Sequence, residues 1–238
     1  MRASGRYDDE MRKVTIETGI LTHAEGSCLI SCGNTQVICA ASLGQRVPIF
    51  RRNTGLGWVT AEYAMLPRAT NTRNRRESLD GRPSGRTFEI QRLIGRALRS
   101  CVHAASLGER QINIDCDVIN ADGGTRCAAI TGAWIALRMA IDQLRENGTL
   151  THDPLTHQMA AVSCGVVGGN AILDLEFSED SEAETDANFV INDSGGLIEV
   201  QCSSEKVPFT DESLAQMLAL ARAGTETLFG IQKAALAN

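Results

Sequence analysis

The sequence lacks the residue patterns that build metal centres and disulfide scaffolds. No two of its eight cysteines have CxxC spacing, and its four histidines are scattered: His23, His103, His152 and His157. A zinc site is therefore not expected. The cysteines lie among apolar residues of predicted strands and helices, so we interpret them as small core residues of a protein in a reducing compartment.

Long apolar runs are absent as well. No stretch approaches the length of a membrane span, and the charged segment from Met1 to Arg12 contains no signal-peptide core. We therefore expect a cytoplasmic protein without a membrane partner. An overall positive charge is also lacking, because the net charge is -6. This excludes a protein that grips nucleic acid with its whole surface, so such a partner must bind a local basic patch.

What is present is the pattern of an α+β fold. A hydrophobic content of 43% is enough for a large core, and we expect a single domain over residues 1–238. Alternating apolar residues and glycine-containing turns predict that each half begins with antiparallel strands, and helical spacing predicts that each half ends in a helix. The predicted strands include 27–32, 36–42, 58–65, 111–119, 159–167, 171–177, 186–192 and 197–203, and the main helices begin at 86, 127 and 210.

A glycine pair lies where a predicted strand turns into a helix. The stretch Asp122-Gly123-Gly124-Thr125-Arg126 separates the strand at 111–119 from the helix at 127–146. The first amides of a helix have no partner within it, and the helix dipole is positive there, so an anion can bind beside Arg126. The alternative is a tight turn whose glycines serve only the backbone geometry. The stretch alone favours neither.

Arginine is concentrated between Arg68 and Arg99. This segment contains nine arginines, three acidic residues and no lysine. The planar guanidinium group matches phosphate oxygens in pairs, which suits contact with a polyanion. The first part shows no periodicity and is expected to be a loop, whereas the second is an amphipathic helix. Arg86 begins that helix and can support an anion there. For Arg92, Arg96 and Arg99 we expect a solvated face or a subunit contact.

Seven carboxylates occupy the thirteen positions from Asp174 to Asp186. Asp174 and Glu176 alternate with apolar residues and are expected on one face of a strand, while Asp180 and Asp186 bracket a short loop. Mg²⁺ prefers oxygen ligands and usually takes one or two protein carboxylates, so Asp180 and Asp186 are candidate metal ligands. The alternative is a solvated acidic loop, which is what we expect for Glu179, Glu182 and Glu184.

Together these three features favour phosphoryl transfer on nucleic acid. The arginine-rich loop would hold a polyanion, the helix start a small anion, and the carboxylate pair a metal ion. A histidine base is not required if the nucleophile is already an oxyanion, and inorganic phosphate satisfies that condition.

The sequence resembles the ribonuclease PH family of bacterial phosphate-dependent 3′ exoribonucleases over almost its whole length. It departs from the family pattern at Ala3, Ala187 and Cys202, none of which is a proposed ligand. The resemblance rests on Arg2-x-Ser4-Gly5-Arg6, His23-Ala-Glu-Gly-Ser27, Gly57-Trp-Val-Thr-Ala-Glu-Tyr63, Met65-Leu-Pro-Arg-Ala-Thr70, Ser84-Gly-Arg-Thr87, Glu89-Ile-Gln-Arg-Leu-Ile-Gly-Arg96, Asp115-Cys-Asp-Val118, Ala121-Asp-Gly-Gly-Thr-Arg126, Glu179-Asp180-Ser181, Glu184-Thr-Asp186 and Gln232-Lys-Ala-Ala-Leu236.

This resemblance implies a fold of the ribosomal protein S5 domain 2 type, with antiparallel and mixed sheets and helices packed on one side. It implies phosphorolytic trimming of the 3′ end of tRNA precursors, and of ribosomal RNA, with release of nucleoside diphosphates and a reverse reaction that adds nucleotides. It also implies a homohexamer built as a trimer of dimers. The implied site residues are Asp180 and Asp186 as catalytic ligands of Mg²⁺ or Mn²⁺, Arg86, Gly124, Thr125 and Arg126 for phosphate, and Arg68, Arg73 and Arg76 for tRNA.

Two other functions remain open. A catalytically silent ring subunit would keep the fold but lose the phosphate and metal residues, all of which this sequence retains. A small-molecule phosphotransferase on a similar fold would not need the arginine-rich loop from Arg68 to Arg82.

Overall fold

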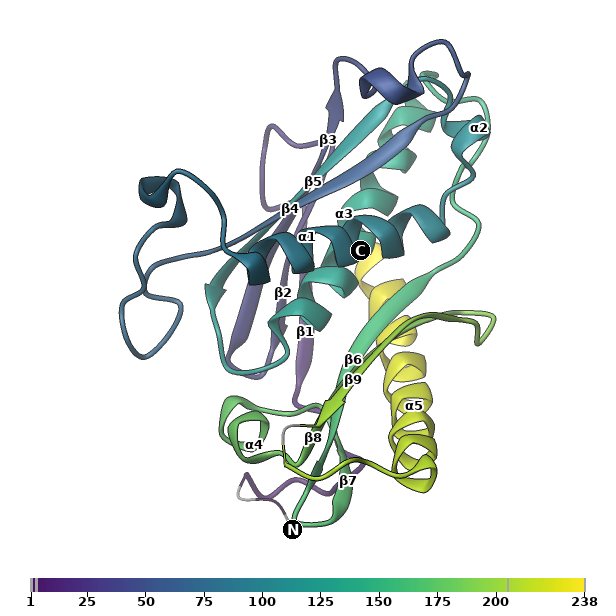
Figure 1. The fold of residues 1–238 in the computed structure, drawn as a ribbon. Helices are drawn as coiled ribbons and strands as arrows, with labels where there is room; N and C mark the ends of the chain where they lie inside the picture. The colour runs from purple at the N-terminus through teal and green to yellow at the C-terminus, as the bar shows by residue number, and fades with distance from the viewer. Residues whose placement is uncertain (1, 3, 205, 238) are drawn as a thin grey trace.

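A computed structural model describes residues 2, 4–204 and 206–237, which form two β-sheets on either side of a long helix (Figure 1). The first sheet has the strand order β1-β2-β3-β5-β4. Neighbouring strands are antiparallel except β4 and β5, which are parallel and are connected through helices α1 and α2. These elements are β1 (Val14–Thr18), β2 (Gly26–Cys32), β3 (Thr35–Gly44), β4 (Trp58–Met65), α1 (Gly85–Ser100), α2 (Ala104–Leu107) and β5 (Gln111–Asn120).

The second sheet is antiparallel and has the order β7-β6-β8-β9. Its strands are β6 (Met159–Val167), β7 (Asn170–Leu173), β8 (Thr185–Asn192) and β9 (Leu197–Ser204). The short helix α4 (Phe177–Glu182) joins β7 to β8, and the C-terminal helix α5 (Asp211–Leu236) packs on β6. Two short 3-10 helices, η1 (Ile49–Arg51) and η2 (Glu77–Asp80), lie in loops of the first half.

Helix α3 (Thr125–Glu146) is buried on most of its circumference because it packs between the sheets. It contacts β2, β3 and β5 of the first sheet and β6 of the second. Met159, Ala161 and Val190 of the second sheet belong to the same buried cluster as α3. One continuous core thus joins the two halves and fixes the start of α3 relative to α4 and β8.

Helices α1 and α3 pack against the first sheet and against each other, on one face of the sheet. The strand β5 shows why: Ile112 and Ile114 point into the core, whereas Asp115 and Asp117 lie on the opposite, polar face. The predicted α+β fold, with mixed sheets and helices on one side, is confirmed. No helix in the described part of the chain is long and apolar enough to cross a membrane.

Most predicted strands and the three long helices are confirmed to within a few residues. The strand predicted over 171–177 is wrong beyond Leu173, because Asp174 has a left-handed backbone (φ 55°) that turns the chain towards α4. The segment before α1 is not loop throughout, since it contains η2. All eight cysteines are free and seven are buried, as expected of core residues, with Cys202 half-buried. Ala3, one of the departures from the family pattern, lies outside the described residues.

Candidate active site

A cleft of ≈ 670 Å³ lies where the two halves meet. Its walls come from the starts of α1 and α3, from α4 and β8, and from the loop before α1. Seven of the predicted site residues line it: Arg76, Arg86, Gly124, Thr125, Arg126, Asp180 and Asp186. The structure therefore brings the predicted phosphate and metal residues to one place, although they come from both halves of the chain.

The turn that contains Gly123 and Gly124, called the glycine turn below, gives α3 an open N-terminus. Gly123 (φ 77°) and Gly124 (φ 67°) both have left-handed backbones, which glycine adopts without strain. Gly124 is the N-cap and makes no side-chain hydrogen bond to the first turn. The first-turn amides of α3 therefore line the cleft with positive potential and are available to a bound anion. The glycines thus serve the backbone geometry, as the second interpretation expected, and the uncapped helix start leaves room for the anion of the first, which stays a prediction.

Thr125 is held by a residue that was not predicted as a site residue. The hydroxyl of Tyr63 on β4 donates a hydrogen bond of 2.9 Å to Thr125 Oγ1. Burial raises the pKa of Tyr63, although its hydrogen bond to Thr125 and the charges of Arg86 and Arg126 oppose that effect. Tyr63 therefore stays protonated and donates to Thr125. A threonine hydroxyl that accepts one hydrogen bond still has its own proton to donate.

Arg126 is also held by two residues that the sequence did not reveal. Its Nη1 donates to Gln201 Oε1 on β9 at 2.7 Å, and its Nη2 lies 3.5 Å from Glu89 Oε2 on α1. Gln201 Nε2 in turn donates to Glu89 Oε1 at 2.9 Å. This triad orients the guanidinium group of Arg126 at the edge of the cleft.

Asp180 and Asp186 face the cleft from two elements. Asp180 lies on α4, not in a loop as expected, and Asp186 lies on β8, where Ser203 donates a hydrogen bond of 3.0 Å to its Oδ1. Burial raises the pKa of Asp180, and the charge of Asp186 raises it further, whereas Arg86 and Arg126 act against this rise. The two carboxylates are thus close enough to repel each other, and a cation relieves such repulsion.

The pair fits a hard divalent cation only as part of its ligand set. No group of three or more histidine, cysteine, aspartate or glutamate residues in the described part of the chain is arranged to hold a metal ion. Mg²⁺ commonly binds through one or two carboxylates and keeps its remaining positions for water and substrate phosphate. Two carboxylates facing an open cleft agree with that mode of binding.

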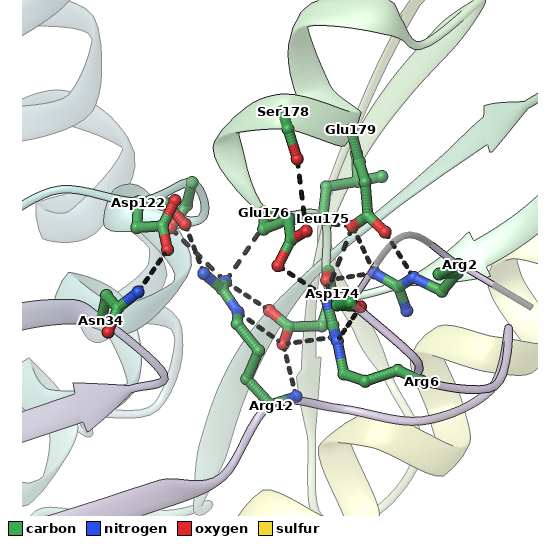
Figure 2. Close-up of polar contacts among 12 residues, drawn as sticks. Arg2, Arg6, Arg12, Asn34, Asp122, Asp174, Leu175, Glu176, Ser178 and Glu179 are labelled. Atoms are coloured by element: carbon green, nitrogen blue, oxygen red, sulfur yellow. Dashed lines mark hydrogen bonds and ion pairs between the residues drawn. The ribbon is translucent and has the colours of Figure 1, made fainter.

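The other carboxylates of the acidic stretch have different roles. Glu179 was expected in a solvated loop, but it is 7% exposed and binds Arg2 through two hydrogen bonds of 2.6 and 2.5 Å (Figure 2). Asp174 was expected on a strand face, but it is buried and binds Arg12. Burial raises the pKa of both carboxyls, but hydrogen bonds and charges from the arginines outweigh it, so that both pKa values lie below their usual range. These two residues are structural.

The predicted RNA-binding arginines are not gathered at one point. Arg76 lines the cleft, whereas Arg68 and Arg73 are exposed on the loop before α1. Arg68 donates to the carbonyl of Asn71, within the same loop. Figure 1 shows this segment projecting from the body of the molecule between β4 and the start of α1.

Two arginines further along α1, Arg96 and Arg99, have partners outside the cleft. Arg96 forms a salt bridge of 2.7 Å with Glu199 on β9. Arg99 stacks 4.2 Å above the ring of Trp58 and donates to the carbonyl of Val59. Arg99 is therefore half-buried and not fully solvated, while Arg92 is exposed, and the alternative of a subunit contact stays a prediction.

Comparison with known proteins agrees with this architecture. Residues 10–141 match the 3′ exoribonuclease family, domain 1, and residues 157–224 match domain 2 of the same family. Ribonuclease PH of Methylobacterium radiotolerans is 58% identical over 237 residues, which cover 100% of both chains. Ribonuclease PH of Cereibacter sphaeroides is 57% identical over 236 residues, which cover 99% of this chain and 100% of that protein.

Solved structures share the fold at low sequence identity. The Archaeoglobus fulgidus exosome with RNA bound to the active site matches with a TM-score of 0.81 and 22% identity, covering 96% of this chain and 91% of that one. Rice Rrp46 matches with a TM-score of 0.79 and 19% identity, covering 98% of each chain. The family matches, the high identity over the full length and the shared fold lead to one conclusion: the chain belongs to the ribonuclease PH family of 3′ exoribonucleases.

Proposed function

We propose that this protein shortens RNA from the 3′ end by phosphorolysis, with inorganic phosphate as the nucleophile. One observation carries the proposal: the open N-terminus of α3 and the carboxylates Asp180 and Asp186 line the same cleft. The first feature suits a small anion, and the second suits a cation that neutralises a scissile phosphodiester.

Inorganic phosphate binds at the start of α3. The amides that follow Gly124 donate to its oxygens, and the Thr125 hydroxyl, oriented by Tyr63, adds a further donor. Arg86, at the start of α1, and Arg126, at the start of α3, supply positive charge to the cleft. These groups hold the phosphate oxygen in line with the bond that breaks, which is the main contribution a protein makes to phosphoryl transfer.

Asp180 and Asp186 would hold Mg²⁺ or Mn²⁺ in the cleft. When bound there, the cation supplies positive charge that stabilises the charge developing on the phosphoryl oxygens. Hydrogen bonding from Ser203 orients Asp186, and the helix α4 orients Asp180. The two residues act as ligands and are not required to take up a proton.

The reaction balances without a protein base. An oxygen of inorganic phosphate forms a bond to the phosphorus of the last phosphodiester, and the bond from that phosphorus to the 3′ oxygen of the preceding nucleotide breaks. The terminal nucleotide leaves as a nucleoside diphosphate, and the new 3′ oxygen takes a proton from solvent or from the attacking phosphate. The reverse reaction adds a nucleotide from a diphosphate.

The preferred substrate is the 3′ end of a tRNA precursor, and ribosomal RNA is a second substrate. Arg68, Arg73 and Arg76 lie on the loop beside the cleft, where guanidinium groups can contact the phosphates of a folded RNA. Phe177, which is 58% exposed and lines the cleft, offers a stacking surface for a base. An RNA substrate agrees with the family of the chain and with the RNA-bound exosome that shares its fold.

The assembly that we propose is a homohexamer, a trimer of dimers, in the cytoplasm. The exosome cores that share the fold support a multi-subunit assembly. We further infer that the two halves of each chain act as a single domain, because the core around α3 includes side chains of both sheets.

The proposal is tested by incubating the protein with a tRNA that carries a 3′ extension, with and without added phosphate. We expect trimming only with phosphate, and nucleoside diphosphates as products. Monophosphate products in phosphate-free buffer would contradict phosphorolysis. No trimming under either condition would favour a silent ring subunit, and turnover of small phosphate esters but not RNA would favour a small-molecule phosphotransferase.

A further inference from the structure

Arg12 lies between the turn before α3 and the turn before α4, although the reaction described above does not use it. It precedes β1, and its side chain is 7% exposed. Figure 2 shows its guanidinium group between Asp122, in the turn before α3, and Asp174, in the turn before α4.

Arg12 holds the turn at Asp174, which leads into α4 and so to Asp180. Its Nε donates to Asp174 Oδ2 at 2.9 Å and its Nη2 to Oδ1 at 2.7 Å, while its backbone amide donates to Oδ2 at 2.8 Å. Its Nη2 also donates to the carbonyl of Leu175 at 3.3 Å. Because Asp174 has a left-handed backbone, these bonds fix the direction in which the chain enters α4.

The same guanidinium group also holds the glycine turn before α3, where we propose that phosphate binds. Its Nη1 donates to the carbonyl of Asp122, and its Nη2 lies 3.5 Å from the carbonyl of Gly123. The two turns are in direct contact, since a Cβ on Gly123 would come within 2.5 Å of the Leu175 carbonyl oxygen. Any shift of one turn must therefore move the other.

Lysine cannot replace this arrangement. The guanidinium plane of Arg12 meets both carboxylate oxygens of Asp174 and, with its third nitrogen, the Asp122 carbonyl on the far side. A lysine ammonium is a single point of charge with no fixed fork, so it cannot span both turns in one geometry. Burial makes the loss severe, because a buried carboxylate without its partner is destabilised.

We infer that Arg12 is a positioning residue. It fixes the distance between the phosphate site at the start of α3 and the carboxylate pair of Asp180 and Asp186. This inference rests on the proposed function, because phosphate binding at the start of α3 is itself part of that proposal. It assigns an effect on phosphate binding to a residue outside the cleft. Arg12 lies outside the cleft lining and acts through its contacts with Asp122, Gly123, Asp174 and Leu175.

The test compares Arg12→Lys with Arg6→Lys. Arg6 contacts Asp174, Glu176 and Glu179, and within the described part of the chain its hydrogen bonds and ion pairs do not reach the glycine turn. We expect Arg12→Lys to raise the KM for phosphate by about 10-fold to 100-fold, as for other residues that orient ligands. Calorimetric titration with inorganic phosphate, without RNA, is expected to show the same loss. Arg6→Lys is expected to lower the Tm but to keep the KM for phosphate within about twofold of wild type.

A third variant keeps the inference testable if Arg12→Lys does not fold. Asp174→Asn keeps the shape of the side chain and suits a left-handed backbone. It removes the charge, and so weakens the hydrogen bonds and the ion pair with Arg12. We expect it to raise the KM for phosphate as well, even though Asp174 lies outside the cleft lining.

The outcomes separate this inference from the proposed function. Equal KM values for phosphate in wild type, Asp174→Asn and any folded Arg12 variant would overturn the role of Arg12 while leaving phosphorolysis in place. Equal increases in Arg6→Lys and Arg12→Lys would also overturn it, because they would indicate a general loss of stability. A wild-type protein that neither binds nor requires phosphate would overturn the proposed function and this inference with it.

Discussion

The hydroxyl of Tyr63 donates a hydrogen bond of 2.9 Å to Thr125 Oγ1, at the first residue of α3. This bond joins β4 of the first sheet to the proposed phosphate site and sets the direction of the remaining Thr125 proton. A donor that is already oriented does not lose rotational freedom when the anion binds, which favours both binding and reaction.

Removing this hydroxyl tests the role of the bond. Tyr63→Phe is expected to raise the KM for phosphate by about three- to tenfold, the effect of losing roughly 1 kcal/mol. Thr60→Val removes a hydroxyl from the same strand outside the cleft lining and serves as the control. Steady-state kinetics with phosphate as the varied substrate provides the measurement. An unchanged KM in Tyr63→Phe would show that the bond is only structural.

The charge of Asp180 is expected to be needed for turnover but not for RNA binding. Asp180→Asn keeps the size of the side chain and removes one of the two carboxylates that can hold a cation, so kcat is expected to fall by about 100-fold or more. Glu182→Gln, on the exposed side of the same short helix, is the matched control. Filter binding with tRNA and a single-turnover assay separate the two effects. Full activity in Asp180→Asn would contradict the metal assignment.

The arginine loop is expected to act on RNA affinity alone. Arg73→Ala removes an exposed charge from the loop and is expected to weaken tRNA binding and to reduce the salt dependence by about one counterion. Arg92→Ala removes an exposed arginine from α1, where we expect no RNA contact. Affinities measured over a range of salt concentrations give both slopes. An unchanged slope in Arg73→Ala would exclude this residue as an RNA contact.

The arginine-carboxylate network of Figure 2 predicts how stability depends on pH. Asp174 and Glu179 have pKa values below their usual range in the folded protein. The unfolded chain therefore binds protons first, and the stabilisation is complete above a pH of about 4 and is lost as the pH falls below it. Thermal unfolding between pH 7 and pH 3 is expected to show a nearly constant Tm down to about pH 5 and a steep fall below about pH 4. A Tm that does not fall in acid would contradict the assignment.

Local sequence patterns predicted the strands and helix starts that are determined by residues close together in the sequence. Alternation along 111–119 gave β5, and the glycine pair marked the open start of α3, because both signals lie within one element. The start of α4 was missed because one left-handed residue, Asp174, ends a strand pattern that otherwise continues to Phe177. Side-chain alternation cannot reveal such a turn.

Pairings between distant residues could not be predicted in this way. Arg12 and Asp174 are 162 positions apart, and Glu89 and Gln201 are 112 apart. An arginine before a strand and an aspartate in an acidic stretch both look solvated until the fold brings them together. The resemblance to a known family supplied the residues that we propose bind the reactants, but the neighbours that hold those residues in place are visible only in the structure.

The central claim is that inorganic phosphate is a reactant and becomes part of the product. Incubation of a 3′-extended tRNA with radiolabelled inorganic phosphate, followed by separation of the released nucleotides, tests it directly. We predict that the label appears in the terminal phosphate of nucleoside diphosphates, one for each nucleotide removed, and that Arg126→Ala greatly reduces the incorporation. Release of unlabelled nucleotides at the same rate would contradict the account.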